Sequence, residues 1–481
     1  MTRPADKIDG DRRGFIVRAL LMGGGLMTAG LVACEPPASS DRNLRLPPAS
    51  DARGDRVAEG EPGGKPPRVI VIERPLPPTT EPTIRVRIAA LRPPSRRIRI
   101  EGDGGRVFIG SVDGVAKPVA TPAEIEATIE GWIVIEHAGT RSAGTFQFPA
   151  QSALAIRPAP GSKGVRFGEG LAGTSAWPFE IRCTHRTDEG VGAVDVVCHV
   201  ALETYLPGVL AKELYPNWSR ETFLAQCVAA RSFALCEMAQ NTDRHFDVVA
   251  GEASQAWTGA TTHATSLAAA RSTLGMSLVF DGRVVPTYYS STCGGRPANA
   301  TDAIAAGSFN AIQPLMVTAN SARDCCKAAP SWRWRMSLPT AETAKRLAAW
   351  AKTERPAMAR IDGLRGIEVA SINACGRPVT FRITDTRNQE FEIPAERLRW
   401  AFNADVGALP AVRSRVKSAD FAAQVTAVSV TLDGRGYGHG VGMCQYGAEA
   451  MSKAGSTWRD ILRFYYPGAE ITQSYGRTAN T

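Results

Sequence analysis

The sequence predicts an α+β protein in which an antiparallel β-rich region precedes a mixed α/β region. Between residues 84 and 200, short segments alternate apolar and polar residues and are separated by Gly, Pro or Asp, a pattern typical of strands in antiparallel sheets. Residues 202–238 then show the spacing of two amphipathic helices. Beyond them, predicted strands and helices alternate until a glycine-rich loop near residue 440.

Length and charge narrow the classes of function. A chain of 481 residues is long enough for two or three domains. The net charge is +9 and 21% of the residues are charged, but no run of Lys or Arg is interleaved with aromatic residues. This composition argues against a nucleic-acid partner and suits an exported protein that meets an acidic polymer or an anionic membrane surface.

The first 34 residues have the parts of an export signal. Arg12 and Arg13 precede an apolar run, residues 19–32, that is too short to span a bilayer. The arginine pair resembles a twin-arginine signal, and the run ends in Leu-Val-Ala-Cys, which resembles a lipoprotein cleavage site. We therefore expect lipidation at Cys34 and an extracytoplasmic lipoprotein anchored to the membrane. An ordinary secretory signal with a chance cysteine is the alternative.

Residues 35–83 are expected to form a disordered tether. They are rich in Pro, Gly, Ser and charge, and such a composition cannot bury a core. A flexible segment of about fifty residues reaches on the order of 40 Å. The predicted β-rich region, residues 84–195, follows the tether and shows no residue pattern of its own that indicates chemistry.

The first predicted helix ends in a carboxylate. Leu202, Leu206, Val209 and Glu213 lie on one face, at spacings of four, three and four. Desolvation raises the pKa of a carboxylate at the end of an apolar stripe, which suits a general acid. The alternative is a glutamate at the rim of the helix that points to solvent.

The second predicted helix carries an arginine inside its apolar stripe. Ser219 is its expected N-cap, and Arg231 lies in the middle of a stripe made by Leu224, Cys227, Val228, Leu235 and Met238. A guanidinium on an apolar face needs a partner. The sequence leaves three partners open: another carboxylate, backbone carbonyls or a substrate.

Two polar loops follow the helices. A predicted hairpin around Asp281-Gly282 leads into the segment YYSSTCGG, residues 288–295, and a second loop surrounds His439 with five glycines. A serine nucleophile, Ser290 or Ser291, with His439 lacks a nucleophile signature.

A thiol nucleophile, Cys293 or Cys444, competes with disulfide formation or an inert thiol. Ten cysteines are present, and nine of them follow Cys34, an odd number that leaves at least one thiol unpaired. Cys183 and Cys198 flank a turn and are candidates to bridge two strands. The six histidines are scattered and no C-x-x-C pair exists, so we expect no metal site and no cofactor.

Four motifs together resemble the SpoIID/LytB family, the stage II sporulation protein D and amidase-enhancer group. They are LETYLPGVLAKEL, AQCVAARSFAL, YYSSTCGGRPA and GRGYGHGVGMCQYGAEAM, and they occur in the order of the family. The resemblance implies a SpoIID-like catalytic domain over residues 196–475.

The resemblance further implies a lytic transglycosylase that cleaves the glycan strands of peptidoglycan and leaves 1,6-anhydromuramyl ends. Glu213 stands at the position of the catalytic acid of the family. The motif positions expected to bind substrate are Gln226, Arg231, Ser291, His439 and Gln445. The alternative is a non-catalytic, glycan-binding enhancer of a partner cell-wall amidase.

The chain also departs from the family. Leu224 replaces a lysine of some members, and of the zinc-binding cluster of some sporulation members only His245 remains. We therefore expect no zinc there. The resemblance instead suggests a disulfide between Cys293 and either Cys325 or Cys326.

Overall fold

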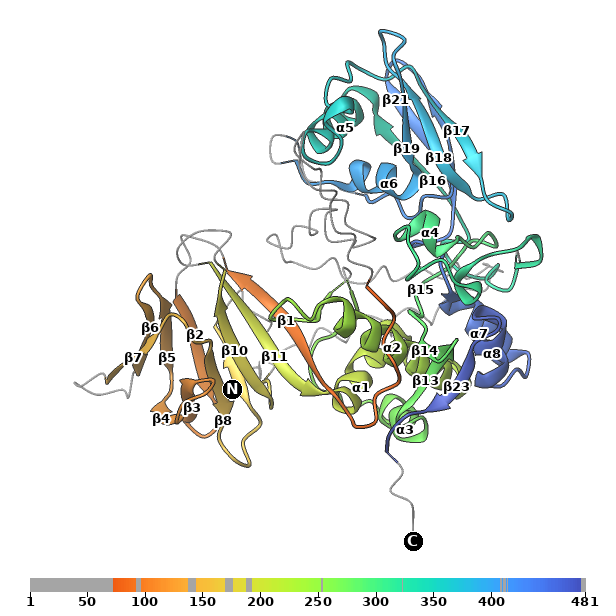
Figure 1. Ribbon diagram of the computed structural model, residues 1–481. Coiled ribbons are helices and arrows are strands. Elements are labelled where there is room, and N and C mark those ends of the chain that lie inside the picture. Colours follow the sequence, from red (N-terminus) through yellow and green to blue (C-terminus); the bar gives the residue numbers. More distant parts are fainter. Residues whose placement is uncertain are drawn as a thin grey trace, which may run out of the picture. The chain divides into compact units, whose positions relative to one another are not determined.

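Two largely antiparallel sheets form the first part of the described chain. A computed structural model (Figure 1) describes residues 72–476 except 92–96, 137–143, 169–175, 187–192, 252–253, 322, 407–408, 410–411 and 413. The predicted signal segment, Cys34 and the predicted tether up to residue 71 lie outside the described residues.

The larger sheet has the strand order β12-β1-β11-β10-β8-β3-β4, and the smaller one β7-β6-β5-β2-β9. Within the larger sheet, β12 lies parallel to β1 and the other neighbours are antiparallel. The strands are β1 Thr83–Leu91, β2 Arg97–Gly102, β3 Arg106–Ser111, β4 Lys117–Ala120, β5 Ala123–Ala127, β6 Gly131–Glu136, β7 Thr145–Pro149, β8 Leu154–Pro158, β9 Val165–Phe167, β10 Glu180–His185, β11 Val194–Ala201 and β12 Val248–Val249.

The strands alternate buried and exposed residues, as their sequences predict. In β2, Ile98 and Ile100 are buried while the residues between and beside them face outward. They belong to the same hydrophobic cluster as Ile109 and Ile156 of the larger sheet. The two sheets therefore bury a common core, and the predicted α+β class with an antiparallel N-terminal region is confirmed.

The predicted bridge between Cys183 and Cys198 is wrong. In the pairing of β10 with β11, Cys183 stands opposite Val196, and Cys198 stands opposite Ile181. The two cysteines are thus diagonal neighbours, a relation that separates Cα atoms by about 7–8 Å, beyond the usual reach of a disulfide. Both are buried thiols in the core.

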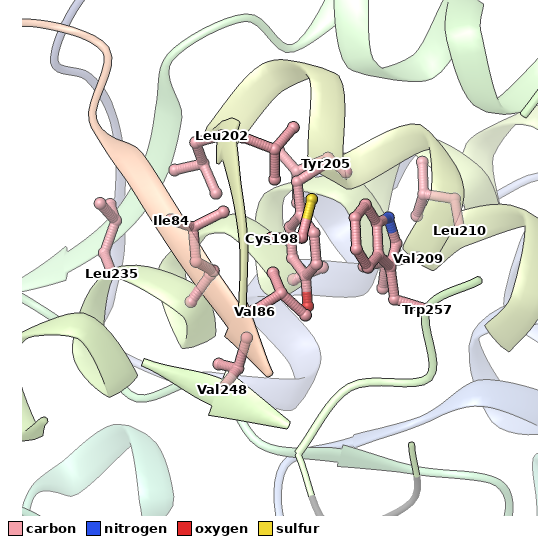
Figure 2. Close-up of a cluster of buried hydrophobic side chains, with 14 of the residues drawn as sticks. Ile84, Val86, Cys198, Leu202, Tyr205, Val209, Leu210, Leu235, Val248 and Trp257 are labelled. Atoms are coloured by element: carbon pink, nitrogen blue, oxygen red, sulfur yellow. The ribbon is translucent and has the colours of Figure 1, made fainter. Parts of the chain in front are cut away.

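The two predicted helices follow β11 directly. They are α1 Leu202–Glu213 and α2 Arg220–Gln240, and α3 Ala264–Ser272 packs against both. Tyr205 of α1 lies beside Trp257, with ring centroids 5.2 Å apart (Figure 2). Glycine is needed at 208 because a Cβ there would lie 2.5 Å from Nε1 of Trp257. The close contact of α1 with the segment after α2 is therefore built into the sequence.

A buried carboxylate from the C-terminal segment holds the start of α2. The C-terminal helices are α7 Gln445–Lys453 and α8 Trp458–Tyr465. Ser219 is the N-cap residue of α2, as expected. Its backbone N–H and its hydroxyl donate to Glu449 of α7, and the Thr222 hydroxyl donates to the same carboxylate at 2.8 Å. This contact fixes α7 against the beginning of α2.

A three-stranded sheet, β14-β13-β23, packs on the other part of α2. Its strands are β13 Met276–Phe280, β14 Arg283–Val284 and β23 Glu470–Gln473. The predicted hairpin is present, with positive φ at both Asp281 and Gly282. Residues 72–82, the last part of the predicted tether, reach this sheet: the Arg74 guanidinium donates to the carbonyl oxygens of Phe280 and Arg283.

Residues 333–435 have a hydrophobic core of their own. It is built from the sheets β16-β21-β20 and β17-β18-β19 and from two helices. The elements are β16 Arg333–Pro339, α5 Thr340–Glu354, β17 Gly366–Ile372, β18 Pro378–Thr384, β19 Glu390–Pro394, α6 Ala395–Asn403, β20 Phe421–Val425 and β21 Ser429–Arg435.

Short elements complete the described chain. They are β15 Tyr289–Ser290, α4 Ala300–Ala303, β22 Met443–Cys444 and the single-turn helices Gln313–Leu315, Ala319–Ser321 and Pro356–Met358. Within the described residues, no helix combines the length and apolar character needed to cross a membrane.

Candidate active site

Glu213 is the last residue of α1. The apolar residues that precede it on the same face, Leu202, Leu206 and Val209, are fully buried, whereas Glu213 itself is half-buried. Its Oε1 accepts the backbone N–H of Ala256 at 3.0 Å. The carboxylate therefore stands where the buried face of the helix meets the surface, with its orientation set by a backbone donor.

Gln445 provides the second donor to this carboxylate. Its Nε2 lies 3.2 Å from Oε2 of Glu213, and its side chain is buried at the first position of α7. The first helical motif and the glycine-rich motif are separated by more than two hundred residues in the chain. This hydrogen bond joins them in the folded protein.

A glutamine and two tyrosines form a hydrogen-bonded group beside Glu213. The Tyr205 hydroxyl donates to Oε1 of Gln255 at 3.0 Å, and Nε2 of Gln255 donates to the Tyr289 hydroxyl at 2.9 Å. Burial raises the pKa of each phenol well above the ordinary value for tyrosine, and the negative charge of Glu213 raises both further. Both tyrosines therefore stay protonated and keep a hydroxyl near the carboxylate.

Three aromatic rings adjoin Glu213 and Gln445 in sequence. Tyr215 and Trp218 lie in the turn between α1 and α2, and Tyr446 follows Gln445. The ring centroid of Trp218 is 5.2 Å from that of Tyr215 and 5.0 Å from that of Tyr446. Tyr215 is 41% exposed. Partly exposed rings with a polar edge suit contact with a ligand that has both apolar faces and hydroxyl groups.

The two polar loops of the sequence pair with each other. Strand β15 lies parallel to β22, with Tyr289 opposite Met443, and the N–H of Tyr446 donates to the carbonyl oxygen of Ser291 at 3.1 Å. Gly442 has a φ of +66°, and a Cβ there would lie 2.1 Å from the Tyr288 carbonyl oxygen. Glycine is thus required for the close approach of the two loops.

Sequence comparison identifies the region that contains Glu213. Residues 191–280 match the family described as stage II sporulation protein, SpoIID. Residues 191–280 form a SpoIID domain. Residues 310–442 match a domain of unknown function, DUF8618, which overlaps the separate core of residues 333–435.

Relatives extend the similarity beyond the SpoIID domain. The chain is 25% identical over 303 residues to the amidase enhancer of Bacillus subtilis, covering 56% of this chain and 40% of that protein. It is 24% identical over 358 residues to stage II sporulation protein D of the same organism, covering 71% of this chain and 91% of that protein. An uncharacterized protein of Brachyspira hyodysenteriae is 28% identical over 278 residues, covering 57% of this chain and 68% of that protein. The expected resemblance is confirmed as distant homology.

Two of the expected substrate residues lie inside the SpoIID domain. Arg231 is fully buried; its Nε and Nη2 each lie 2.7 Å from a carboxylate oxygen of Glu203, and Nη1 donates to the Met276 carbonyl oxygen. Of the three partners left open by the sequence, the structure shows a carboxylate and a carbonyl. Gln226 is also fully buried, and its amide has no hydrogen-bond partner among the described residues.

His439 lies outside the SpoIID domain and organises the glycine-rich loop. Its Nδ1 accepts the N–H of Val441 at 3.0 Å, and its carbonyl oxygen accepts a bond from Arg377. Desolvation lowers the pKa of His439 to about 4, so the ring is neutral at pH 7. Burial raises the pKa of the Cys444 thiol to about 12, which argues against Cys444 as a nucleophile.

Sequence reasoning missed Gln255, Tyr205 and Tyr289 as neighbours of Glu213. Tyr205 is buried and directly precedes Leu206 of the apolar stripe, so the pattern marks it as a packing residue. Gln255 lies in a short irregular segment after β12, and no pattern distinguishes such a glutamine. Only the folded chain brings the three side chains together.

Proposed function

We propose that this protein is a lytic transglycosylase that cleaves the glycan strands of peptidoglycan, with Glu213 as its general acid and base. The observation that carries the proposal is the position of one carboxylate, half-buried at the end of α1, held by Ala256 and Gln445 and flanked by aromatic rings. The homology to SpoIID proteins and to an amidase enhancer supports a cell-wall glycan as the ligand.

In the proposed reaction, the Glu213 carboxyl group first protonates the glycosidic oxygen, the bond between that oxygen and C1 of the muramyl residue breaks, and the other sugar leaves with a free hydroxyl. The resulting carboxylate then takes the proton of the muramyl C6 hydroxyl, whose oxygen bonds to C1 and closes a 1,6-anhydro ring. No water is consumed, and the proton returns to Glu213. A single carboxyl group therefore suffices, and the donors at both of its oxygens keep it oriented through the two steps.

The surrounding carboxylates support a one-carboxylate mechanism. A glycoside hydrolase ordinarily needs a second carboxylate at a set separation. Glu203 is engaged by Arg231, Glu221 accepts the N–H of Trp458, and Glu237 lies in the last turn of α2. Burial raises the pKa of Glu237 to about 7. Of the four carboxylates on α1 and α2, Glu213 is the one that the glycine-rich motif contacts, through Gln445.

The test is product analysis with Glu213→Gln. The full chain, purified in detergent, is incubated with peptidoglycan and with glycan stripped of stem peptides, and the products are analysed by mass spectrometry. We expect wild type to release 1,6-anhydromuramyl ends. Glu213→Gln should lose about 10²-fold or more of this activity, while Glu470→Gln, an exposed carboxylate on β23, should keep it.

Two results would change the proposal in different ways. A wild-type protein that releases no anhydro ends from either substrate would exclude the transglycosylase and favour the alternative, a glycan-binding enhancer of a partner amidase, which the name of one homologue suggests. A Glu213→Gln variant with full activity would leave the reaction in place and exclude Glu213 as its catalytic residue.

A further inference from the structure

Three cysteines from distant parts of the chain meet at one point. Cys293 lies in the loop after β15, Cys326 lies 33 residues later, and Cys444 lies 151 residues after Cys293. Their Sγ atoms are all within 4.8 Å of one another, and none of the three residues is more than 7% exposed. All three are thiols in this structure.

The cluster is lined by donors and by aromatic rings. The backbone N–H of Cys293 points at Sγ of Cys444, at 3.4 Å. The Thr292 hydroxyl and the backbone N–H of Gly295 are hydrogen-bond partners of Cys326. Trp332, Tyr446 and Tyr465 pack around the cluster. These donors are the kind of second layer that stabilises thiolate ligands.

The distances between the sulfur atoms favour one metal ion bound by all three cysteines over a disulfide between two of them. A disulfide joins two sulfurs at about 2.0 Å and would leave the third buried beside it. Two thiolates on one tetrahedral zinc ion, with Zn–S bonds of about 2.3 Å, are about 3.8 Å apart. The Sγ atoms of Cys293 and Cys326 are 3.8 Å apart.

We propose that Cys293, Cys326 and Cys444 together bind one thiophilic metal ion, Zn²⁺ or Cu⁺, as thiolates. Soft sulfur ligands select these ions. Binding replaces each S–H bond by an S–metal bond and releases the proton to solvent. Three sulfurs complete a trigonal Cu⁺ site, whereas Zn²⁺ needs a fourth ligand. Among the described residues, no further His, Cys, Asp or Glu belongs to the cluster. The fourth ligand of Zn²⁺ would therefore be water.

The proposed ion would stabilise the loops that position the residues of the candidate active site. Cys444 directly precedes Gln445, which holds Glu213, and Cys293 follows the strand that pairs with β22. The ion would tie these two loops to the segment around Cys326. Its role is structural and does not depend on the proposed glycan chemistry, so the metal and the activity can be tested separately.

The first experiment measures metal content. The full chain is purified in detergent without chelator, and zinc and copper are quantified by mass spectrometry. We expect about one ion per chain, and its identity separates the two ions. Cys293→Ser, Cys326→Ser and Cys444→Ser should each lose the ion, whereas Cys325→Ser, the adjacent thiol outside the cluster, should keep it.

A second experiment uses only wild type, because the serine variants can misfold. Chelator-treated protein is titrated with Zn²⁺ and, anaerobically, with Cu⁺, and Tm is followed. We expect removal of the ion to lower Tm and one of the two ions to restore it at one equivalent. Metal-free protein with a Cys293–Cys326 disulfide, identified by peptide mass spectrometry, would overturn the proposal. So would three thiols that bind neither ion.

Discussion

His439 shows how burial sets the chemical state of a residue that the sequence marks as a candidate catalyst. The ring bonds to the N–H of Val441 and packs edge-on against Tyr288. Because these surroundings disfavour the imidazolium, its pKa lies at about 4. The neutral ring accepts a backbone hydrogen bond and so stabilises the glycine-rich loop. Gln445, which follows this loop, is thereby positioned to bond Glu213.

The low pKa of His439 predicts a pH dependence of stability. Its folded-state pKa, about 4, lies below the ordinary value of 6.5. Its contribution is therefore fully present above pH 6.5 and is lost as the pH falls toward 4, at most about 3 kcal/mol. We expect urea unfolding of wild type to show this loss between pH 7 and pH 4.5.

The matched variant for this prediction is His439→Asn. It removes the titrating group, so the difference between its unfolding free energies at pH 7 and pH 4.5 should be smaller than that of wild type. An equal difference in the two proteins would show that His439 does not carry this pH dependence, whatever the variant costs at pH 7.

At the scale of elements, α1 and α2 are joined by a buried ion pair. Arg231 bonds Glu203 through two nitrogens, and the Tyr475 hydroxyl and the N–H of Gly275 donate to the same carboxylate. Desolvation by itself lowers the pKa of Arg231, but the hydrogen bonds to Glu203 and its negative charge raise it, so Arg231 stays protonated. The pair therefore links both helices to the strand after α3 and to the C-terminal segment.

This arrangement predicts the effect of breaking the pair. Arg231→Met should lower the free energy of unfolding by about 3–5 kcal/mol, because it leaves the Glu203 carboxylate buried without its cation. The double variant Arg231→Met/Glu203→Leu should recover part of this loss. Lys345→Met, at an exposed position of α5, should change stability by no more than about 0.5 kcal/mol.

Urea unfolding followed by circular dichroism measures all three variants. A single variant as stable as wild type would mean that the helices hold together without the ion pair. A double variant no more stable than the single one would mean that lost packing, rather than an unpaired charge, causes the destabilisation.

At the scale of the whole molecule, the proposed anchor determines where a SpoIID domain would act. We propose that Cys34 is lipidated and that the following segment tethers the protein to the membrane. Near the start of the described chain, the Arg74 guanidinium is buried against the hairpin of β13 and β14. If that segment is a flexible tether, as proposed, about forty residues would reach on the order of 40 Å and would keep the domain near the membrane surface.

Cys34→Ser tests this proposal. Without the acceptor thiol, the protein should move from the membrane fraction to the soluble fraction and should not incorporate labelled fatty acid. Cys325→Ser, which leaves Cys34 in place, should remain in the membrane fraction. Unchanged membrane association of Cys34→Ser would exclude lipidation as the anchor.

The sequence by itself determined the local elements and the family. Segment 97–102 alternates apolar and polar residues, and an apolar stripe ends at Glu213. Each pattern indicates which face of its element is buried, because the pattern depends only on residues close together in the chain. Strands β4 and β9 were not predicted, because four residues or three are too few to establish an alternating pattern.

Only the tertiary structure decided which distant residues meet. The bond between Gln445 and Glu213, the group around Gln255, the partner of Arg231 and the three-cysteine cluster all join segments far apart in the chain. Strand register likewise separated Cys183 from Cys198. Such contacts depend on how whole elements pack against one another, and a periodic pattern specifies the buried face of an element without specifying what will cover it.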